Sequence, residues 1–197
     1  MNPKLVFVHG LGGYAGVWRK QMEAFPEAVY LTLPGHPEGD PLASLPNPGE
    51  IDLAELARRV TAETNRALDT RTIRLRIGDS PLLVSGDAEL LEIVLRNLID
   101  NALRYTPPDS TITVFARRQN GELALGVADD GPGVAPEELP RLVERFYRGR
   151  EASAEGSGLG LAIAQRIAEL HAARFEVENL SGGGFEARLR WFRSPVV

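Results

Sequence analysis

Apolar residues recur at three- and four-residue steps between residues 91 and 103, which is the spacing of an amphipathic helix with one buried face. These positions are Leu91, Val94, Leu95, Leu98, Ala102 and Leu103. Asn97 and Asn101 lie four residues apart and therefore share one side of the same helix. Asparagine is a mediocre helix former because its amide competes for backbone hydrogen bonds. Two asparagines one turn apart suggest a role beyond folding, although a solvated helix face would show the same pattern.

Helices and strands alternate along the rest of the chain after residue 50. Asp52 is a good N-cap for a helix that reaches about Leu68, and Asp87 caps the helix that carries the asparagines. Another helix is predicted over 159–171, and strands are predicted over 73–77, 81–84, 111–116, 123–128, 174–179 and 185–192. Asn120-Gly121 is a strong hairpin signal. Interleaved helices and hairpins favour an α/β fold with a mixed sheet that is covered by helices on one face.

The N-terminal part of the chain is organised differently. Residues 4–8 and 28–33 read as short buried strands on either side of a helix over 17–25, a β-α-β unit whose strands should be parallel. Five prolines and three glycines follow up to Gly49, which predicts a linker or an irregular loop. The predicted domains are 1–49 and 50–197.

Composition and charge exclude some classes of function. The 197 residues are 43% hydrophobic and 25% charged, as in ordinary globular proteins. The net charge of −5 argues against nucleic acid or an anionic membrane as a partner. The absence of cysteine excludes disulfides and thiolate metal sites and fits a reducing compartment, so we expect a cytoplasmic protein. No apolar run approaches the roughly 18 residues of a membrane span, so we expect no membrane contact in this chain.

Two glycine-rich segments carry the candidate chemistry. Asp129-Asp130-Gly131-Pro132-Gly133 follows a predicted strand, and Gly156-Ser157-Gly158-Leu159-Gly160 opens a predicted helix. A glycine cluster at the start of a helix lets backbone N–H groups approach an anion, and the helix dipole adds to the attraction. Either segment alone is compatible with a tight turn. The second segment lacks the Lys-Ser/Thr of a Walker loop and does not follow a strand as a dinucleotide fingerprint does.

The order of these motifs over residues 51–192 resembles the ATP-binding catalytic domain of two-component sensor histidine kinases, with its N, G1, F and G2 boxes. The matching segments are RNLIDNALRYTP, VADDGPGV, ERFYRG and GSGLGLAIAQRIAELH. The resemblance implies a two-layer α/β sandwich of histidine-kinase ATPase type that binds ATP and Mg²⁺. It also implies transfer of the γ-phosphoryl group to a histidine, with a phosphoacceptor dimerisation hairpin and a response regulator as partners.

The resemblance assigns roles to particular residues. Asn101 would give its side-chain oxygen to Mg²⁺, a hard cation that prefers oxygen ligands, and Asn97 would support the phosphates or the metal's water shell. Arg104 would lie near the phosphates and Tyr105 beside the adenine. Asp129 would accept a hydrogen bond from the adenine amino group and thereby distinguish ATP from GTP.

The glycines and the F segment complete the implied site. Gly131 and Gly133 would let the base lie against the backbone, and Phe146 with Arg148 would belong to a lid over the nucleotide. The phosphate-facing backbone would come from Gly156, Gly158, Leu159 and Gly160. Phe146 in core packing and Arg148 on a solvated surface are the structural alternatives. The sequence departs from the family pattern at Ala172, which stands where the family usually has a glycine after His171. We expect His171 to pack or to complement the helix dipole.

Several features limit the implied function. None of the histidines, His9, His36 and His171, is followed by an acidic residue, as the phosphoacceptor histidine of the family is. We therefore expect the phosphoacceptor hairpin to be absent and the chain to be a monomer, with any transfer made to an acceptor on another molecule. Asn97 stands where hydrolytic ATPases of this fold carry a glutamate, which disfavours hydrolysis. A non-catalytic nucleotide-binding module is the alternative.

The first 49 residues resemble the opening of an α/β-hydrolase, through LVFVHGLGG, Val17-Trp18 and LTLPGHPEGD. In that family the His-Gly turn helps to form the oxyanion hole, so His9, Gly10 and Leu11 would belong to it. The G-x-S-x-G nucleophile elbow is absent, and no acid and histidine follow in the required order, so hydrolase activity is disfavoured. The chain therefore resembles a graft, which an engineered chimera, a gene fusion or a rearranged reading frame would each produce. A lone β-α-β unit is only marginally stable, so we expect it to dock on the second domain or to be loosely held.

Overall fold

The computed structural model describes residues 6–8, 29–31, 48–68, 71–79, 81–144, 146–147 and 158–192. The chain divides into two compact units, Met1–Leu45 and Pro46–Val197. In the first unit β1 (Val6–Val8) pairs in parallel with β2 (Val29–Leu31), which confirms the predicted parallel pairing. The helix predicted over 17–25 lies outside the described residues, as do His9, Gly10 and Leu11.

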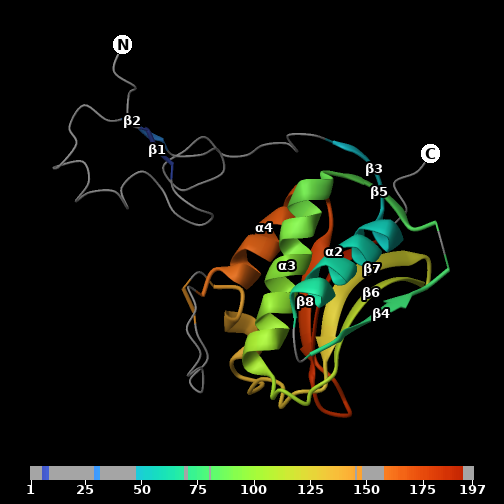
Figure 1. Ribbon diagram of the computed structural model, residues 1–197, viewed down its shortest axis with the longest axis vertical. Coiled ribbons are helices and arrows are strands. Elements are labelled where there is room, and N and C mark those ends of the chain that lie inside the picture. Colours follow the sequence, from blue (N-terminus) through green and yellow to red (C-terminus); the bar gives the residue numbers. More distant parts are fainter. Residues whose placement is uncertain are drawn as a thin grey trace. The chain divides into compact units, whose positions relative to one another are not determined.

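The second unit is a two-layer α/β sandwich, as predicted. Its elements are β3 (Gly49–Asp52), α2 (Leu53–Ala67), β4 (Ile73–Ile77), β5 (Leu83–Gly86), α3 (Ala88–Tyr105), β6 (Ile112–Gln119), β7 (Glu122–Asp129), the 3-10 helix η2 (Leu139–Arg141), α4 (Gly160–Leu170), β8 (Arg174–Asn179) and β9 (Phe185–Trp191). The five-stranded sheet has the order β4-β6-β7-β9-β8, in which β4 and β6 are parallel and the other neighbours antiparallel. Figure 1 shows α2, α3 and α4 on one face of this sheet.

Two helices, α2 and α3, begin where their capping residues predict. Asp52 Oδ1 accepts a hydrogen bond from the backbone N–H of Ala54 at 2.9 Å. Asp87 Oδ1 accepts from two N–H groups in the first turn of α3, which would otherwise lack partners. Five of the six predicted apolar positions of α3 are buried in the core, and Leu103 is half-buried. The core therefore lies between the apolar face of α3 and the sheet.

The hairpin between β6 and β7 has the predicted turn. Asn120 and Gly121 both have positive φ, 54° and 80°, and they separate the paired residues Gln119 and Glu122. A two-residue turn with both central residues at positive φ matches the right-handed twist of the flanking strands. Asparagine and glycine tolerate this conformation better than other residues, so the local sequence determines the register of this hairpin.

Two strands differ from the sequence prediction. A strand is predicted over 81–84, whereas β5 covers Leu83–Gly86. β3 lies where the linker was predicted to end, and it pairs antiparallel with β5 so that Ile51 stands opposite Val84, with both side chains buried. The four residues of β3, GEID, show no alternation of apolar and polar positions that would mark a strand. Its hydrogen-bond partners in β5 are distant in sequence, so only the folded structure reveals it.

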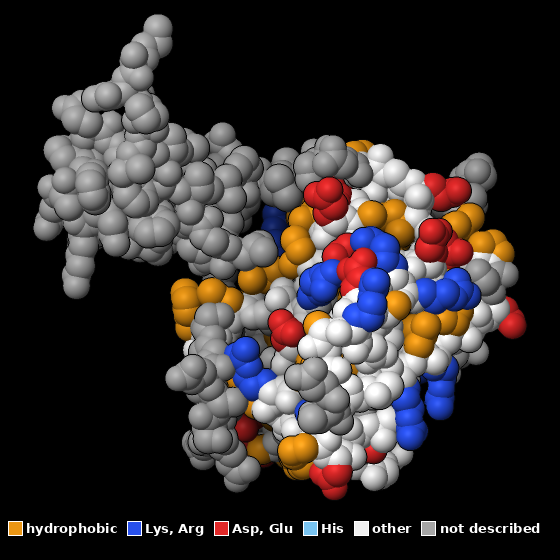
Figure 2. All heavy atoms as spheres, in the orientation of Figure 1, with side chains coloured by type: hydrophobic (Ala, Val, Ile, Leu, Met, Phe, Trp, Pro, Cys, Tyr) orange, Lys and Arg blue, Asp and Glu red, His pale blue; other side chains and the backbone are white. Residues whose placement is uncertain are grey.

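Acidic and basic side chains gather over α2 and α3 on the face seen in Figure 2. Arg59 pairs with Glu92 at 2.7 Å, and Arg96 pairs with Glu63 and Glu92 at 2.6 and 2.7 Å. Exposed ion pairs of this kind contribute about 0–1 kcal/mol each. The association of the two helices therefore depends mainly on their buried apolar faces. No helix among the described residues combines the length and apolar character needed to span a membrane.

His171 packs at the end of α4, as the sequence analysis predicted. Its side chain is buried, and Nε2 accepts a hydrogen bond from the backbone N–H of Asp87 at 2.9 Å. This requires the proton on Nδ1, which donates to the carbonyl of Ile167 at 2.8 Å. The His171 carbonyl accepts from the indole N–H of Trp191. The histidine thus joins the end of α4 to the start of α3 and to β9.

The residue after His171 keeps the helix-ending turn despite the missing glycine. Ala172 has a φ of 50°, in the left-handed region. The N–H of Ala173 donates to the carbonyl of Ala168 at 2.9 Å, and the N–H of Ala172 donates to the carbonyl of Glu169 at 3.1 Å. These two bonds form a Schellman motif, in which the residue at positive φ is usually glycine.

We expect Ala172→Gly to stabilise the domain by about 1 kcal/mol. The left-handed conformation costs a residue with a Cβ roughly 1–2 kcal/mol, and glycine avoids this cost. Glycine also loses more conformational entropy on folding, which offsets part of the gain. Thermal unfolding should then show a melting temperature about 2–4 °C higher than that of the wild type. A lower melting temperature in the glycine variant would contradict this account of the turn.

Candidate functional site

The two asparagines lie where α3 meets the start of α4. His171 at the end of α4 contacts the start of α3, so the two helices run antiparallel and the start of α4 faces the middle of α3. A Cβ built on Gly160 would lie 3.8 Å from Asn97 Cβ and 4.0 Å from its Oδ1. The predicted N-box helix and the second glycine segment are therefore neighbours in space.

Asn97 carries an unusual polar atom. Its Nδ2 is buried and has no hydrogen-bond partner among the described residues. Buried side-chain amides nearly always have partners, and one without them costs on the order of 1–3 kcal/mol. Asn101 lies one turn further along the same side of α3, and both side chains are half-buried. The unpartnered donor of Asn97 therefore lies beside the glycine that opens α4.

The first glycine segment packs against the other end of α3. Asp129 is the last residue of β7 and is 9% exposed. Its Oδ1 accepts a hydrogen bond from the backbone N–H of Gly131 at 3.0 Å. A Cβ on Gly131 would lie 2.8 Å from Thr106 Cγ2, so only glycine fits at this position without a shift of its neighbours. Asp129 is therefore linked through Gly131 to Thr106, at the C-terminal end of the helix that carries the asparagines.

Burial raises the pKa of the Asp129 carboxyl above its usual range. The N–H groups of Gly131 and Phe185 oppose this rise because they stabilise the carboxylate, and the charge of Arg71 opposes it as well. The nearby charge of Asp130 acts in the same direction as burial. A buried carboxyl group with a perturbed pKa is frequent in functional sites.

The raised pKa of Asp129 gives an expected pH dependence of stability. The folded state holds the Asp129 proton more tightly than the unfolded chain, whose aspartate pKa is about 3.9. The resulting stabilisation is fully present below that value and is lost as the pH rises through the folded pKa. Urea unfolding of the wild type and Asp129→Asn at several pH values should therefore show the wild type losing free energy of unfolding relative to the variant as the pH rises above about 4. A relative gain would contradict the raised pKa.

The backbone after Asp129 is held by a residue that sequence reasoning missed. Asn179, at the end of β8, accepts from the N–H of Val134 at 2.9 Å and donates to its carbonyl at 2.6 Å. Asn179 Oδ1 also lies 2.8 Å from where a Cβ on Gly133 would be. Gly133 has a φ of 73°, so both its space and its conformation favour glycine. No sequence signal links Asn179 to this loop because the two are 45 residues apart.

The F segment contacts the second glycine segment directly. The backbone N–H of Phe146 donates to the carbonyl of Gly158 at 3.0 Å. Gly158 has a φ of 69°, and a Cβ there would lie 2.8 Å from the Phe146 carbonyl carbon. The Phe146 side chain is 67% exposed, which contradicts the core-packing alternative. An exposed phenylalanine on a backbone fixed to Gly158 is compatible with a lid.

The remaining predicted site residues make no described contact with the other predicted site residues. Arg104 and Tyr105 lie exposed at the end of α3, and Leu159 is half-buried immediately before α4. Arg148 and Gly156 lie outside the described residues. The predicted residues that the described contacts bring close together are Asn97 with Gly160, Asp129 with Gly131, and Phe146 with Gly158.

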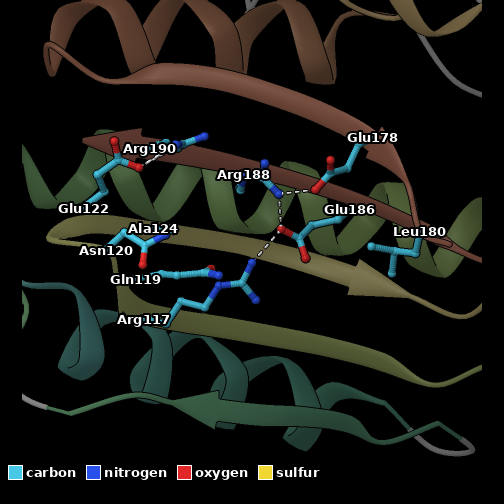
Figure 3. A pocket seen from close by; sticks show the side chains of 10 residues that line it. All are labelled: Arg117, Gln119, Asn120, Glu122, Ala124, Glu178, Leu180, Glu186, Arg188 and Arg190. Atoms are coloured by element: carbon cyan, nitrogen blue, oxygen red, sulfur yellow. Dashed lines mark hydrogen bonds and ion pairs between the residues drawn. The ribbon is translucent and has the colours of Figure 1, made fainter. Parts of the chain in front are cut away.

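A hollow of about 370 Å³ lies elsewhere, on the face of the sheet that carries no helix (Figure 3). It is lined by Arg117, Gln119, Asn120, Glu122, Ala124, Glu178, Leu180, Glu186, Arg188 and Arg190. Three arginines face three glutamates there, and Arg188 pairs with both Glu178 and Glu186. The charges neutralise one another, so we assign this hollow to the stability of the sheet and not to the candidate site.

Comparison with known proteins places this arrangement in a family. Residues 86–195, more than half of the chain, match the family described as histidine kinase-, DNA gyrase B-, and HSP90-like ATPase. The chain belongs to this family.

Within the ATPase family the similarity is to sensor histidine kinases. The sensor protein QseC of Escherichia coli (strain K12) is 40% identical over 154 residues, which are 77% of this chain and 33% of the relative. The structure of the mycobacterial sensor histidine kinase MprB covers 75% of this chain and 99% of its own, with a TM-score of 0.63 and 27% identity. Full-length ShkA in complex with AMPPNP has a TM-score of 0.61 and 28% identity over 75% of this chain and 31% of its own.

These comparisons confirm the predicted fold of histidine-kinase ATPase type. The ATPase domain is of the type that sensor histidine kinases use as their ATP-binding catalytic domain. The chain spans about a third of the length of the curated relatives it matches.

Proposed function

We propose that this chain is the Mg·ATP-binding catalytic domain of a sensor histidine kinase. It donates the γ-phosphoryl group of ATP to a histidine on a separate phosphoacceptor domain. The observation that carries the proposal is the buried amide nitrogen of Asn97, which lacks a partner among the described residues and lies beside Gly160. An N–H donor next to a glycine at a helix start is suited to a phosphate oxygen.

The two asparagines then divide the binding of phosphate and metal. The unpaired group of Asn97 is a donor, which suits an anion and cannot ligate a cation. Asn101 supplies the amide oxygen that Mg²⁺ prefers, and the phosphates and water complete the coordination of the ion. When bound, the ion neutralises charge that develops on the phosphates during transfer. Gly158, Leu159 and Gly160 direct backbone N–H groups and the positive end of the α4 dipole toward the phosphates.

The base is recognised at the other end of α3. Asp129 accepts a hydrogen bond from the adenine amino group, whereas guanine presents a carbonyl at the equivalent position. Tyr105 packs beside the adenine, Gly131 and Gly133 let the base lie against the backbone, and Arg104 lies toward the phosphates. Phe146 and Arg148 belong to the lid over the nucleotide, and Gly156 belongs with the phosphate-facing glycines.

The partners follow from the same proposal. The phosphoacceptor is a dimerisation hairpin on another molecule, and the phosphoryl group continues to a response regulator. The ATP-binding domain by itself is a cytoplasmic monomer that makes no contact with nucleic acid or membrane. The N-terminal segment that resembles a hydrolase fragment contributes nothing to nucleotide binding in this proposal.

Two measurements test the proposal. Calorimetry should show a single ATP site per chain whose affinity increases when Mg²⁺ is added. Radiolabelled ATP, this chain and a separately supplied hairpin with a phosphoacceptor histidine should then give acid-labile phosphohistidine. Binding without phosphohistidine would favour the non-catalytic module, and absence of ATP binding would refute the whole proposal.

A further inference from the structure

Arg71 holds the end of α3 from outside the recognised motifs. Its Nη1 donates to the carbonyl of Leu103 at 3.1 Å. Its Nη2 donates to Thr106 Oγ1 at 2.7 Å and to the carbonyl of Ser110 at 3.4 Å. Carbonyls in the last turn of a helix lack intrahelical partners, and a cation there also complements the helix dipole. One half-buried guanidinium therefore fixes both the end of α3 and the loop that leads to β6.

Thr106 transmits this constraint toward the first glycine segment. Its Oγ1 accepts from Arg71 and donates to the carbonyl of Ala102 at 2.6 Å, so both uses of the hydroxyl define its rotamer. The Thr106 methyl group is then directed at Gly131, where it would be 2.8 Å from a built Cβ. Gly131 in turn donates its N–H to Asp129 Oδ1 at 3.0 Å.

We propose that Arg71 is a positioning residue for base recognition, which acts through Thr106 and Gly131 to hold the Asp129 carboxylate in the orientation that selects adenine over guanine. This inference rests on the proposed function, because it requires that Asp129 faces the base. The Arg71 hydrogen bonds go to Leu103, Thr106 and Ser110, so its contact with the Asp129 segment runs through Thr106 and Gly131. Its positive charge also favours the ionised form of Asp129, which is the form that accepts the adenine amino hydrogen.

Nothing in the family match assigns this role to Arg71. The match begins at residue 86, and Arg71 precedes β4. Its hydrogen-bond partners lie 32 to 39 residues further along the chain, so the connection exists only in the folded domain.

The test measures the affinities for Mg·ATP and Mg·GTP by calorimetry for the full chain and four variants. Arg71→Met removes the guanidinium and keeps an unbranched side chain of similar length. Thr106→Val removes the hydroxyl and keeps a methyl group facing Gly131. The double variant completes a mutant cycle, and Arg76→Met, an exposed arginine on β4, is the matched control.

We expect Arg71→Met and Thr106→Val each to lower the ratio of ATP to GTP affinity by about tenfold. The double variant should be no worse than either single variant, because both remove the same connection. Arg76→Met should keep the wild-type ratio. The melting temperature of each variant shows at which assay temperatures it is folded. If Arg71→Met is unfolded at all of them, the affinity ratio of Thr106→Val decides the test.

Two outcomes would overturn the inference. A wild-type ratio in Arg71→Met and Thr106→Val, with only the melting temperature lowered, would show that the contact is purely structural. Additive losses in the double variant would show that the two residues act separately. Failure of the wild type to bind Mg·ATP would refute the proposed function itself, so the two failures are distinguishable.

Discussion

Asn101→Ala is expected to lower the affinity of the domain for Mg·ATP roughly 100-fold, which corresponds to about 2.7 kcal/mol. Alanine removes the amide oxygen that we assign to Mg²⁺. Asn97 is the neighbouring amide on the same side of α3, but its unpaired group among the described residues is the donor nitrogen, which cannot replace that oxygen. The fold should be little affected, because Asn101 is half-buried and alanine is the best helix former.

The metal dependence makes this prediction specific. Wild-type affinity for ATP should fall strongly when Mg²⁺ is removed with EDTA, whereas the affinity of Asn101→Ala should change little. Asp100→Ala is the control, since Asp100 is exposed and lies about 100° around the helix from Asn101. Equal sensitivity to EDTA in the wild type and Asn101→Ala, measured by calorimetry, would remove Asn101 from the metal site.

The largest loss of stability is expected from Glu186→Ala, which should lower the free energy of unfolding by about 3 kcal/mol. The Glu186 side chain is 6% exposed and pairs with Arg117 at 3.0 Å and with Arg188 at 2.5 Å (Figure 3). Arg188 retains Glu176 and Glu178, but Arg117 loses the one carboxylate that the described contacts give it. Removing one partner of a buried ion pair costs much more than the pair contributes, because the remaining charge stays desolvated.

Glu178→Ala is the matched control because Glu178 pairs with the same Arg188. Its side chain is 51% exposed, so its loss should cost less than about 1 kcal/mol. Thermal unfolding should place the melting temperature of Glu186→Ala about 6–12 °C below the wild type and that of Glu178→Ala within about 4 °C of it. Similar shifts in both variants would show that burial does not govern this network.

Local chemistry made several elements predictable. Asp52 and Asp87 cap their helices through their own side chains, and Asn120-Gly121 adopts the turn that its residue types favour. The apolar stripe of α3 is buried as its periodicity requires. Each of these features depends on residues within one or two turns of each other, so a short window of sequence contains the cause.

Other features depend on partners that are distant in sequence. β3 is a strand because β5 supplies its hydrogen bonds, and its own residues show no alternation. Asn179 holds the loop at Val134, and His171 joins α4 to Asp87, across 45 and 84 residues respectively. Ala172 shows the opposite case, in which the helix-ending turn forms although the local residue type disfavours its positive φ.

The motif order alone thus determined the family, the fold and the identity of most candidate site residues, because side-chain chemistry and spacing are properties of the chain. Only the tertiary structure decided which of those residues meet. It placed Asn97 beside Gly160, left the Asn97 amide nitrogen without a partner among the described residues, and brought Arg71 to the end of α3. Burial and long-range contact arise when separate segments pack together, and no single segment contains that information.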